Sequence, residues 1–540
     1  MIWASLFSIA NAGPLQAHLL YFVLVDRFEN GDKTNDVAID LHDPQAFHGG
    51  DLKGLTNKLP YIQKLGADAI WLSPIFHMRT KKFEGHGAFH GYWVQNLDAI
   101  EPAFGGEEAL LALAQESDKQ GISLIMDMVY NHVSFDSPMR NTHKDWFHEE
   151  KTIVDWNDPY ELTHYQVHGL PDLDQSNEEV YTYLRTRSEE WRTKALLSGF
   201  RIDAIRHMEN EFLSRLATDL HQDSTWLLGE DFQGNPVALI DRAKKSGLDS
   251  FFDFPNYYAM TDLFCKDASV GAFAGNLWLD HQYPKDLQLV TFLDNHDLPR
   301  LHSLCAPDKA MQAMFTQFSV RGLPMITYGT EVGLQGMHEP ENRIDMRWDV
   351  VHPLQSMITE LTALRTAHPV LERGTGFVEY LDKNIMIYTQ FLDGESASLA
   401  INRSDNSLSY PHPLTDCRQV TTSFSTCTTP NIPANSVRMW LDKREYLPSK
   451  KIRSEIHVSP CTPEQDLRLV GSTPILGGWN PQKGLSLVER DGVCHASLLI
   501  EEQAVLRFKV VKIENNAVTW GQGPDHILWN KANLSIAWKP

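Results

Sequence analysis

The chain has 540 residues, and its 70 acidic residues outnumber its 48 basic residues, which gives a formal net charge of −22. Nucleic acids and anionic membrane surfaces are polyanions, so we expect neither as a partner of so acidic a chain. Hydrophobic residues make up 42% of the chain, which excludes global disorder, and no apolar run approaches the ~20 residues of a membrane-spanning helix. At about 150 residues per domain, the length predicts three or four domains.

Residues 1–18 form an N-terminal segment that precedes the first predicted strand. They contain an apolar stretch and the step Ala10-Asn11-Ala12, which is typical of a signal-peptide cleavage site, but they lack the basic start of a secretory signal. Three interpretations stay open: the remnant of an export signal, an N-terminal strand, and a truncated start. Export would place the protein in the extracellular or periplasmic space.

Eight short apolar runs alternate with amphipathic helical segments over the first two thirds of the chain. Each run is too short for a typical helix and too continuously apolar for a half-exposed strand, which favours buried parallel strands. Eight strand–helix units predict an α/β fold, a (β/α)₈ TIM barrel. The runs are residues 19–25, 69–73, 122–127, 200–205, 225–230, 248–254, 289–294 and 324–329.

Two of the intervening helices have recognisable ends. The first is expected over 106–121, ending on Gly121, because glycine commonly terminates helices. The second is expected to begin after an N-cap at Ser176 or Asn177 and to end on Gly199.

The rest of the chain departs from this alternation. Residues 133–175, after the third strand, are rich in His, Asp, Trp and Pro and predict an inserted subdomain. From about residue 371, apolar alternation with turn-rich connections indicates antiparallel strands. The predicted domains are the barrel (19–132 and 176–370), the insertion (133–175), a C-terminal β-domain (371–442), a linker (443–455) and a β-sandwich (456–540).

The chain has six cysteines, and none forms a CxxC pair, so we expect no thiolate zinc site. The spacing of Cys417 and Cys427 would allow them to close a small loop. The spacing alone does not identify the redox compartment.

Polar clusters follow four of the predicted strands. They are DMVYNH (127–132), GFRIDAIRH (199–207), GEDF (229–232) and FLDNHD (292–297). A (β/α)₈ barrel brings the carboxyl ends of its strands into one ring, where chemistry takes place. Clustered carboxylates repel one another, so one stays ionised while another is driven toward a raised pKa. Glycosidic cleavage requires that division between a carboxylate and a carboxylic acid.

These four segments resemble the signature regions of the α-amylase family, glycoside hydrolase family 13. LPDLDQ (170–175) resembles the family's additional conserved region, and the likeness covers roughly residues 19–440. The resemblance implies a retaining mechanism on α-1,4-linked glucans, such as starch, glycogen and maltooligosaccharides.

The resemblance also implies roles for individual residues. Asp203 would be the nucleophile, Glu230 the general acid and then base, and Asp297 a residue that binds sugar hydroxyls and helps to distort the ring. Arg201, two residues before Asp203 on the same strand face, would hold Asp203 ionised. Sugar contacts would come from His90, Tyr92, His132, His207, His296 and Arg343.

The resemblance to the family implies calcium as the cofactor, a hard cation that takes oxygen ligands. The resemblance implies a structural ion held by Asn131, Asp172 and the backbone carbonyl of His207. A second, N-terminal ion would occupy a loop that resembles the calcium loop of cyclodextrin glucanotransferases, although Asx-rich loops are usually plain turns. Its ligands would be Asn30, Asp32, Asn35, Asp36 and Asp51.

The C-terminal unit resembles a starch-binding module of carbohydrate-binding module family 20. The likeness rests on LVGSTPILGGWNP (469–481), LRFKVV (506–511) and VTWGQGPDH (518–526). It implies that Trp479 and Trp520 stack on glucose rings while Lys509 hydrogen-bonds to hydroxyls. The chain departs from the family pattern at Gly521, Asp525 and Cys494, so only one sugar site is expected.

The leading hypothesis is a monomeric, endo-acting α-amylase. The alternative is a cyclodextrin glucanotransferase or maltogenic-type transglycosylase, which the N-terminal loop, HEPENR (338–343) and Phe232 favour. Two features disfavour it. His168 occupies the position of the central Tyr or Phe of those enzymes, and 443–456 is too short for their extra β-domain. A remote alternative is an inactive glucan-binding protein, which the presence of all three carboxylates disfavours.

Overall fold

The computed structural model describes the chain apart from residues 1–13, 80, 411–417, 421–424, 427–430 and 446–449. The candidate cleavage step at residues 10–12 and the Cys417–Cys427 pair therefore fall outside the described residues. Among those described, no helix is both long and apolar enough to cross a membrane.

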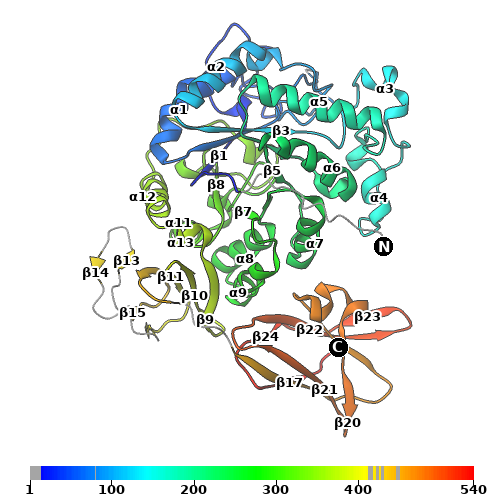
Figure 1. The fold of residues 1–540 in the computed structure, drawn as a ribbon, viewed down its shortest axis with the longest axis vertical. Coiled ribbons are helices and arrows are strands. Elements are labelled where there is room, and N and C mark those ends of the chain that lie inside the picture. Colours follow the sequence, from blue (N-terminus) through cyan, green and yellow to red (C-terminus); the bar gives the residue numbers. More distant parts are fainter. Residues whose placement is uncertain (1–13, 80, 411–417, 421–424, 427–430, 446–449) are drawn as a thin grey trace, which may run out of the picture.

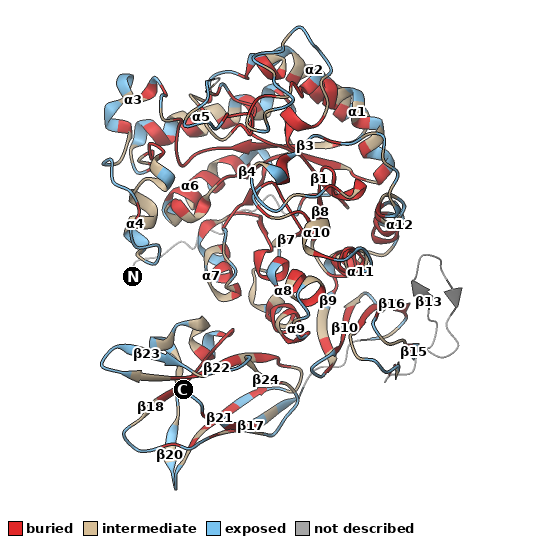
Figure 2. Cartoon of the chain, turned by 180° about the vertical axis from the view of Figure 1, so that it is seen from behind, coloured by how far each residue is buried: buried red, intermediate tan, exposed pale blue. Residues whose placement is uncertain are grey.

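Eight parallel strands close into a barrel in chain order, with β1 paired to β8 (Figure 1). Each lies within or overlaps one of the eight apolar runs, so the predicted barrel is confirmed. Their residues are almost all buried, which is why the runs are continuously apolar (Figure 2). The strands are β1 (Leu20–Val23), β2 (Ala69–Leu72), β3 (Ser123–Met128), β4 (Gly199–Ile202), β5 (Trp226–Gly229), β6 (Ser250–Phe252), β7 (Gln288–Thr291) and β8 (Leu323–Thr327).

Helices surround the barrel. Both predicted helix ends were too late: α2 ends at Lys119 and α5 at Lys194. Gly199 instead belongs to β4, where a Cβ would lie 2.2 Å from the Trp226 carbonyl oxygen of β5, so this position requires glycine. The barrel helices are α1 (Leu52–Leu65), α2 (Gly106–Lys119), α5 (Glu178–Lys194), α6 (Asn210–Leu220), α7 (Pro236–Ser246), α8 (Phe254–Cys265), α9 (Gly271–Trp278), α10 (Leu301–Leu304), α11 (Pro307–Phe318), α12 (Pro353–Ala367) and α13 (Val370–Arg373).

The insertion between β3 and α5 holds two short helices, α3 (Met139–Thr142) and α4 (Pro159–His164). Its last residues hydrogen-bond to its first: the Leu173 amide donates to the Asn131 carbonyl oxygen (2.9 Å). This closure brings Asp172 beside the end of β3. α5 begins with Asn177 as its N-cap, one of the two residues predicted, and the Asn177 side chain accepts the Glu179 amide (2.9 Å).

The C-terminal β-domain is antiparallel, as predicted. Its larger sheet has the order β14-β13-β16-β11-β10-β9, and β12 pairs with β15. Its strands are β9 (Thr375–Leu381), β10 (Ile385–Leu392), β11 (Glu395–Asn402), β12 (Leu408–Ser409), β13 (Arg418–Val420), β14 (Ser425–Thr426), β15 (Asn431–Ile432) and β16 (Ser436–Asp442).

The last unit has two sheets with a core of their own. Its first strand starts at Lys451, so the last five residues of the predicted linker are strand residues. Basic side chains on the outward face of this strand hide the alternation that buries Ser454 and Ile456. The strands are β17 (Lys451–Ser459), β18 (Asp466–Gly471), β19 (Leu485–Ser486), β20 (Val488–Arg490), β21 (Val493–Glu501), β22 (Leu506–Glu514), β23 (Ala517–Trp520), β24 (His526–Leu528) and β25 (Asn533–Ala537).

Two disulfides connect described residues. Cys265, the last residue of α8, is bonded to Cys305 after α10, and Cys461 is bonded to Cys494 within the β-sandwich. The spacing of these cysteines did not predict either pair. The second bond accounts for Cys494, which departs from the family pattern.

Candidate active site

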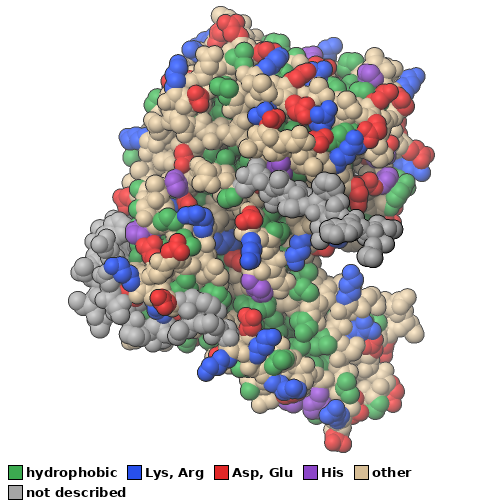
Figure 3. All heavy atoms as spheres, viewed as in Figure 1, with side chains coloured by type: hydrophobic (Ala, Val, Ile, Leu, Met, Phe, Trp, Pro, Cys, Tyr) green, Lys and Arg blue, Asp and Glu red, His purple; other side chains and the backbone are tan. Residues whose placement is uncertain are grey.

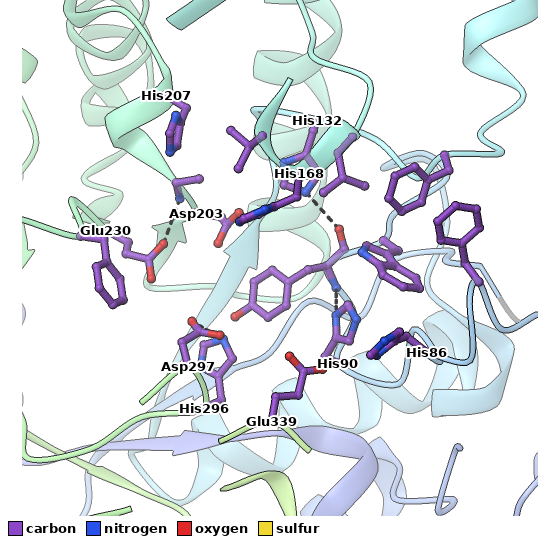
Figure 4. A pocket seen from close by; sticks show the side chains of 18 of the residues that line it. His86, His90, His132, His168, Asp203, His207, Glu230, His296, Asp297 and Glu339 are labelled. Carbon is purple, nitrogen blue, oxygen red and sulfur yellow. Dashed lines mark hydrogen bonds and ion pairs between the residues drawn. The ribbon is translucent and has the colours of Figure 1, made fainter. Parts of the chain in front are cut away.

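A cavity of about 920 Å³ opens at the carboxyl ends of the barrel strands (Figure 4). Its walls come from the segments that follow β2, β3, β4, β5, β7 and β8, and from the insertion. Nine of the predicted site residues line it: His90, Tyr92, His132, Asp203, His207, Glu230, His296, Asp297 and Arg343. Arg201 lies beneath them and is 1% exposed.

One guanidinium organises the carboxylates at the base of the cavity. Arg201 Nη1 donates to Asp203 Oδ1 (2.6 Å), and Arg201 Nη2 lies 2.8 Å from Glu230 Oε1. The other Glu230 oxygen accepts the amide of Ala204 (3.1 Å). Because both carboxylates bond to one planar group, they are held close together on the same side of the cavity.

Asp127, the first residue of DMVYNH, is a site residue to which sequence reasoning gave no role. It is fully buried and accepts hydrogen bonds from Arg201 Nη1 (2.9 Å), Trp71 Nε1 (3.1 Å) and the Tyr92 hydroxyl (2.9 Å). Asp127 therefore fixes both the guanidinium and the aromatic ring from below. Its position at the start of a signature segment was the available signal.

The carboxyl groups differ in their proton affinity. Burial, reinforced by the charges of Asp203 and Asp297 and opposed by Arg201, raises the pKa of Glu230 to about 8. Burial also raises the pKa of Asp297, but His296 and Arg343 outweigh it, so the net pKa lies below the ordinary value. Glu230 is thus protonated at neutral pH while Asp297 is ionised, the separation expected of an acid and a carboxylate that share a site.

Arg343 connects Asp297 to the rim of the cavity. Its Nη2 donates to Asp297 Oδ1 (2.8 Å), its Nε donates to the His296 carbonyl oxygen (2.8 Å), and its Nη1 lies 2.9 Å from Glu339 Oε1. Arg343, predicted as a sugar contact, is therefore paired with two carboxylates, those of Asp297 and Glu339. Glu339 also lines the cavity.

Burial favours the neutral form of four histidines of the site. Burial lowers the pKa of His207 to about 4 and that of His296 to about 3, and it also lowers the pKa of His90 and His132. His132 Nε2 donates to the Tyr92 carbonyl oxygen (3.2 Å), and a neutral imidazole keeps one donor and one acceptor. Such groups match sugar hydroxyls, which also donate and accept. The four rings are labelled in Figure 4.

The expected structural calcium site has side-chain oxygens without partners. Asn131 Oδ1 and Asp172 Oδ1 are buried and have no hydrogen-bond partner among the described residues. Burial raises the pKa of Asp172 to about 6, while His148, whose Nδ1 lies 2.7 Å from Asp172 Oδ2, acts in the opposite direction. Two orphaned oxygens on facing segments are a suitable start for a hard cation, since such oxygens are costly to bury alone.

The N-terminal loop fits less completely. Asp51 is buried and caps α1, and its carboxylate accepts the amides of Gly31, Asp32 and Gly54. Asp32 Oδ1 accepts from Thr34 (2.6 Å), and Asp36 Oδ1 accepts from Asn30 (2.8 Å). Of the five predicted ligands, Asn30 and Asn35 have a buried side-chain oxygen without a partner among the described residues.

The predicted sugar residues of the β-sandwich lie apart from the cavity. Trp520 is 40% exposed, whereas Trp479 is half-buried beneath Arg507, whose guanidinium carbon lies 5.1 Å from the indole centroid. Lys509 Nζ donates to the Gly523 carbonyl oxygen (2.6 Å). Asp525, where the family pattern has Asn, pairs with Arg507 Nε (3.2 Å).

A TIM barrel with clustered carboxylates in a cavity lined by neutral hydroxyl-binding groups has the features of a glycosidase. Residues 22–419 match the family model described as alpha amylase, catalytic domain, and residues 451–536 match that of a starch binding domain. The chain belongs to the alpha-amylase family, glycoside hydrolase family 13. It is an enzyme of this family that acts on starch-like substrates and carries a starch-binding domain.

Relatives in this family differ in their named activity. A beta/alpha-amylase from Paenibacillus polymyxa is 30% identical over 413 residues, which cover 72% of this chain and 34% of that protein, about a third of its length. An Anoxybacillus alpha-amylase structure is 29% identical, with a TM-score of 0.73, covering 81% of this chain and 99% of that one. A cyclomaltodextrin glucanotransferase with a three-domain distribution is 28% identical, with a TM-score of 0.71, covering 79% and 99%.

Proposed function

We propose that the protein is an α-amylase that hydrolyses internal α-1,4-glucosidic bonds of starch or glycogen with retention of configuration. The observation that carries this proposal is the guanidinium of Arg201, which bonds to both Asp203 and Glu230. Retaining glycosidases place their two carboxyl groups close together, whereas inverting enzymes keep them about 6.5–9.5 Å apart to admit water.

The reaction would proceed in two displacements. Glu230 gives its proton to the glycosidic oxygen as that bond breaks, while a carboxylate oxygen of Asp203 bonds to the anomeric carbon. Water then attacks this carbon, Glu230 takes up the proton of the water, and the bond to Asp203 breaks. Ionised Asp297 accepts hydrogen bonds from sugar hydroxyls, and its fixed position supports ring distortion.

The pH dependence follows from the raised pKa of Glu230. Below about pH 8 the group is protonated and can act as the acid, so we expect kcat/KM on starch to fall as the pH rises through about 8. Initial rates at substrate concentrations well below KM, measured from pH 5 to 10, test this expectation. A kcat/KM that stays constant up to pH 10 would contradict the assignment.

We favour a hydrolase over a transglycosylase because of the residue at position 168. It lines the cavity with φ of +52° and presents an imidazole where the resemblance to cyclising enzymes requires an aromatic ring around which the glucan wraps. The missing extra β-domain has less weight than the sequence suggested, since a cyclomaltodextrin glucanotransferase with three domains exists. Phe232, which is 39% exposed at the cavity wall, is compatible with either activity.

Product analysis distinguishes the two activities. We expect purified protein incubated with soluble starch to give linear maltooligosaccharides, with a rapid loss of iodine staining because internal bonds are cut. A parallel reaction with glucose added as an acceptor controls for transfer. Cyclic oligosaccharides as the main early products would contradict the hydrolase and favour the glucanotransferase.

We also propose that calcium binds at Asn131 and Asp172, with the His207 carbonyl as a further ligand, and that it ties the insertion to the barrel. The ion would supply structural charge and take no part in bond cleavage. The N-terminal loop stays a prediction, with Asn30 and Asn35 as its best-placed ligands. A monomer that works outside the cytoplasm, where starch is found, is the simplest setting for this activity.

Removing calcium should lower the melting temperature. A ligand present at 100 times its Kd stabilises the folded state by about 2.7 kcal/mol. For a chain of 540 residues this corresponds to a decrease in melting temperature of about 2–3 °C when a chelator is added. Calorimetry with EGTA and with excess Ca²⁺ measures this difference. In Asn131→Ala the melting temperature should be the same with EGTA and with Ca²⁺. If the wild-type melting temperature is also unchanged by both additions, calcium does not bind at this site.

A further inference from the structure

The starch-binding module packs directly against the barrel. Val505, directly before β22, is fully buried and belongs to the barrel's hydrophobic core, while Trp278 at the end of α9 contacts the cores of both units. A Cβ on Gly271 of α9 would lie 2.7 Å from Ile527 of β24. The module is therefore seated on α9.

A second contact connects the module to the loop of the catalytic acid. The Asn235 side-chain amide donates to the Gly478 carbonyl oxygen (2.8 Å), and its oxygen accepts the Val237 amide as the N-cap of α7. Asn235 follows Glu230 by five residues, and Gly478 directly precedes Trp479. In Figure 1 the orange segment of the module that contains Gly478 and Trp479 lies next to α7.

Exposed aromatic side chains accompany this loop. Phe232 lines the cavity and is 39% exposed. Tyr258 of α8 is 36% exposed and faces Gly234, where a Cβ would lie 3.1 Å from its ring. Residues 232–235 span at most about 11 Å. Phe232, Tyr258 and Trp479 thus border one short path from the cavity to the module. Figure 3 shows hydrophobic side chains, in green, on the module and on the surface where it meets the barrel.

We propose that a single α-glucan chain bound at Trp479 continues over Tyr258 and Phe232 into the cavity, so that Tyr258 is a sugar-stacking residue between the module and the cleft. The inference rests on the proposed function, because the path ends at Glu230. Aromatic rings pack against the C–H faces of sugars. The proposed contact at Tyr258 uses the face of its ring and does not depend on its hydroxyl group. A short oligosaccharide that fills only the cavity would not reach this residue.

The test compares polymer with maltotetraose. We expect Tyr258→Ala to lower kcat/KM on soluble starch roughly three- to tenfold, the effect of one lost aromatic contact, and to leave maltotetraose hydrolysis unchanged. Tyr258→Trp should restore the starch activity. Leu499→Ala, which removes an exposed apolar side chain from the other sheet of the module, is the matched control and should have no effect.

Docking can be tested separately with Asn235→Asp. This change keeps the cap oxygen for Val237 and removes the donor to Gly478, so we expect starch activity to fall while maltotetraose activity and α7 are preserved. The proposed path would be wrong if Tyr258→Ala left kcat/KM on starch unchanged. It would also be wrong if either variant lost activity equally on starch and on maltotetraose. Wild-type protein inactive on maltotetraose and on starch would instead refute the proposed function.

Discussion

Replacing Asp203 with asparagine should lower kcat on starch by at least about 10⁴-fold, the scale of loss seen for catalytic nucleophiles. The amide cannot form the glycosyl ester. Its oxygen can still accept a hydrogen bond from Arg201, but the ion pair that orients the wild-type carboxylate is lost. Substrate binding should survive, because the contacts around Asp297 and the starch-binding domain are untouched.

Stability separates this interpretation from misfolding. Asp203, Glu230 and Asp297 crowd one cavity, and removing one charge relieves repulsion, so the melting temperature should stay the same or rise. The matched control is Asp286→Asn, at an exposed position, which should retain full activity. An Asp203→Asn protein that is folded and cleaves starch within tenfold of the wild-type rate would show that the nucleophile lies elsewhere.

Replacing Glu230 with glutamine should lower kcat on starch by about 10²- to 10⁴-fold, the usual contribution of a general acid. Glutamine keeps the size of the side chain and an oxygen for the Ala204 amide, but it has no proton to give to the leaving sugar. The basic limb of the pH profile near pH 8 should disappear from the residual activity, because the group that titrates there is gone.

Substrates with different leaving groups make this test specific. The fluoride ion of maltosyl fluoride leaves without being protonated. We therefore expect Asp203 to displace it nearly as fast in Glu230→Gln as in the wild type, whereas starch cleavage stays slow. Glu211→Gln, at an exposed position on α6, is the matched control. If fluoride and starch lose activity equally, Glu230 acts by a route other than proton donation.

The barrel could be predicted from the sequence because its strands are buried on both faces. Runs such as residues 122–127 and 289–294 are continuously apolar for that reason, and the polar segments that end them converge only if the strands are parallel. Nine residues from distant segments were thereby placed around one cavity. Local helix ends were predicted less well, as Gly199 shows: it serves the packing of β4 against β5.

Features that depend on contacts between distant side chains were not predictable. The spacing within DMVYNH does not indicate that the Asp127 carboxylate accepts hydrogen bonds from Trp71, Tyr92 and Arg201, because those donors come from three other segments. The charged residues at the start of β17 led to the prediction of a linker where the structure has a strand. The hydrogen bond between Asn235 and Gly478 joins residues 243 apart and rests on how two separately folded units pack.

The anomeric form of the first product shows whether the enzyme retains or inverts the configuration of the cleaved sugar. Proton NMR of wild-type enzyme with maltopentaose, recorded before mutarotation, reports whether the new reducing end is α or β. Because Asp203 and Glu230 are held by one guanidinium, we predict two displacements and an α-anomer. A β-anomer as the first product would contradict it.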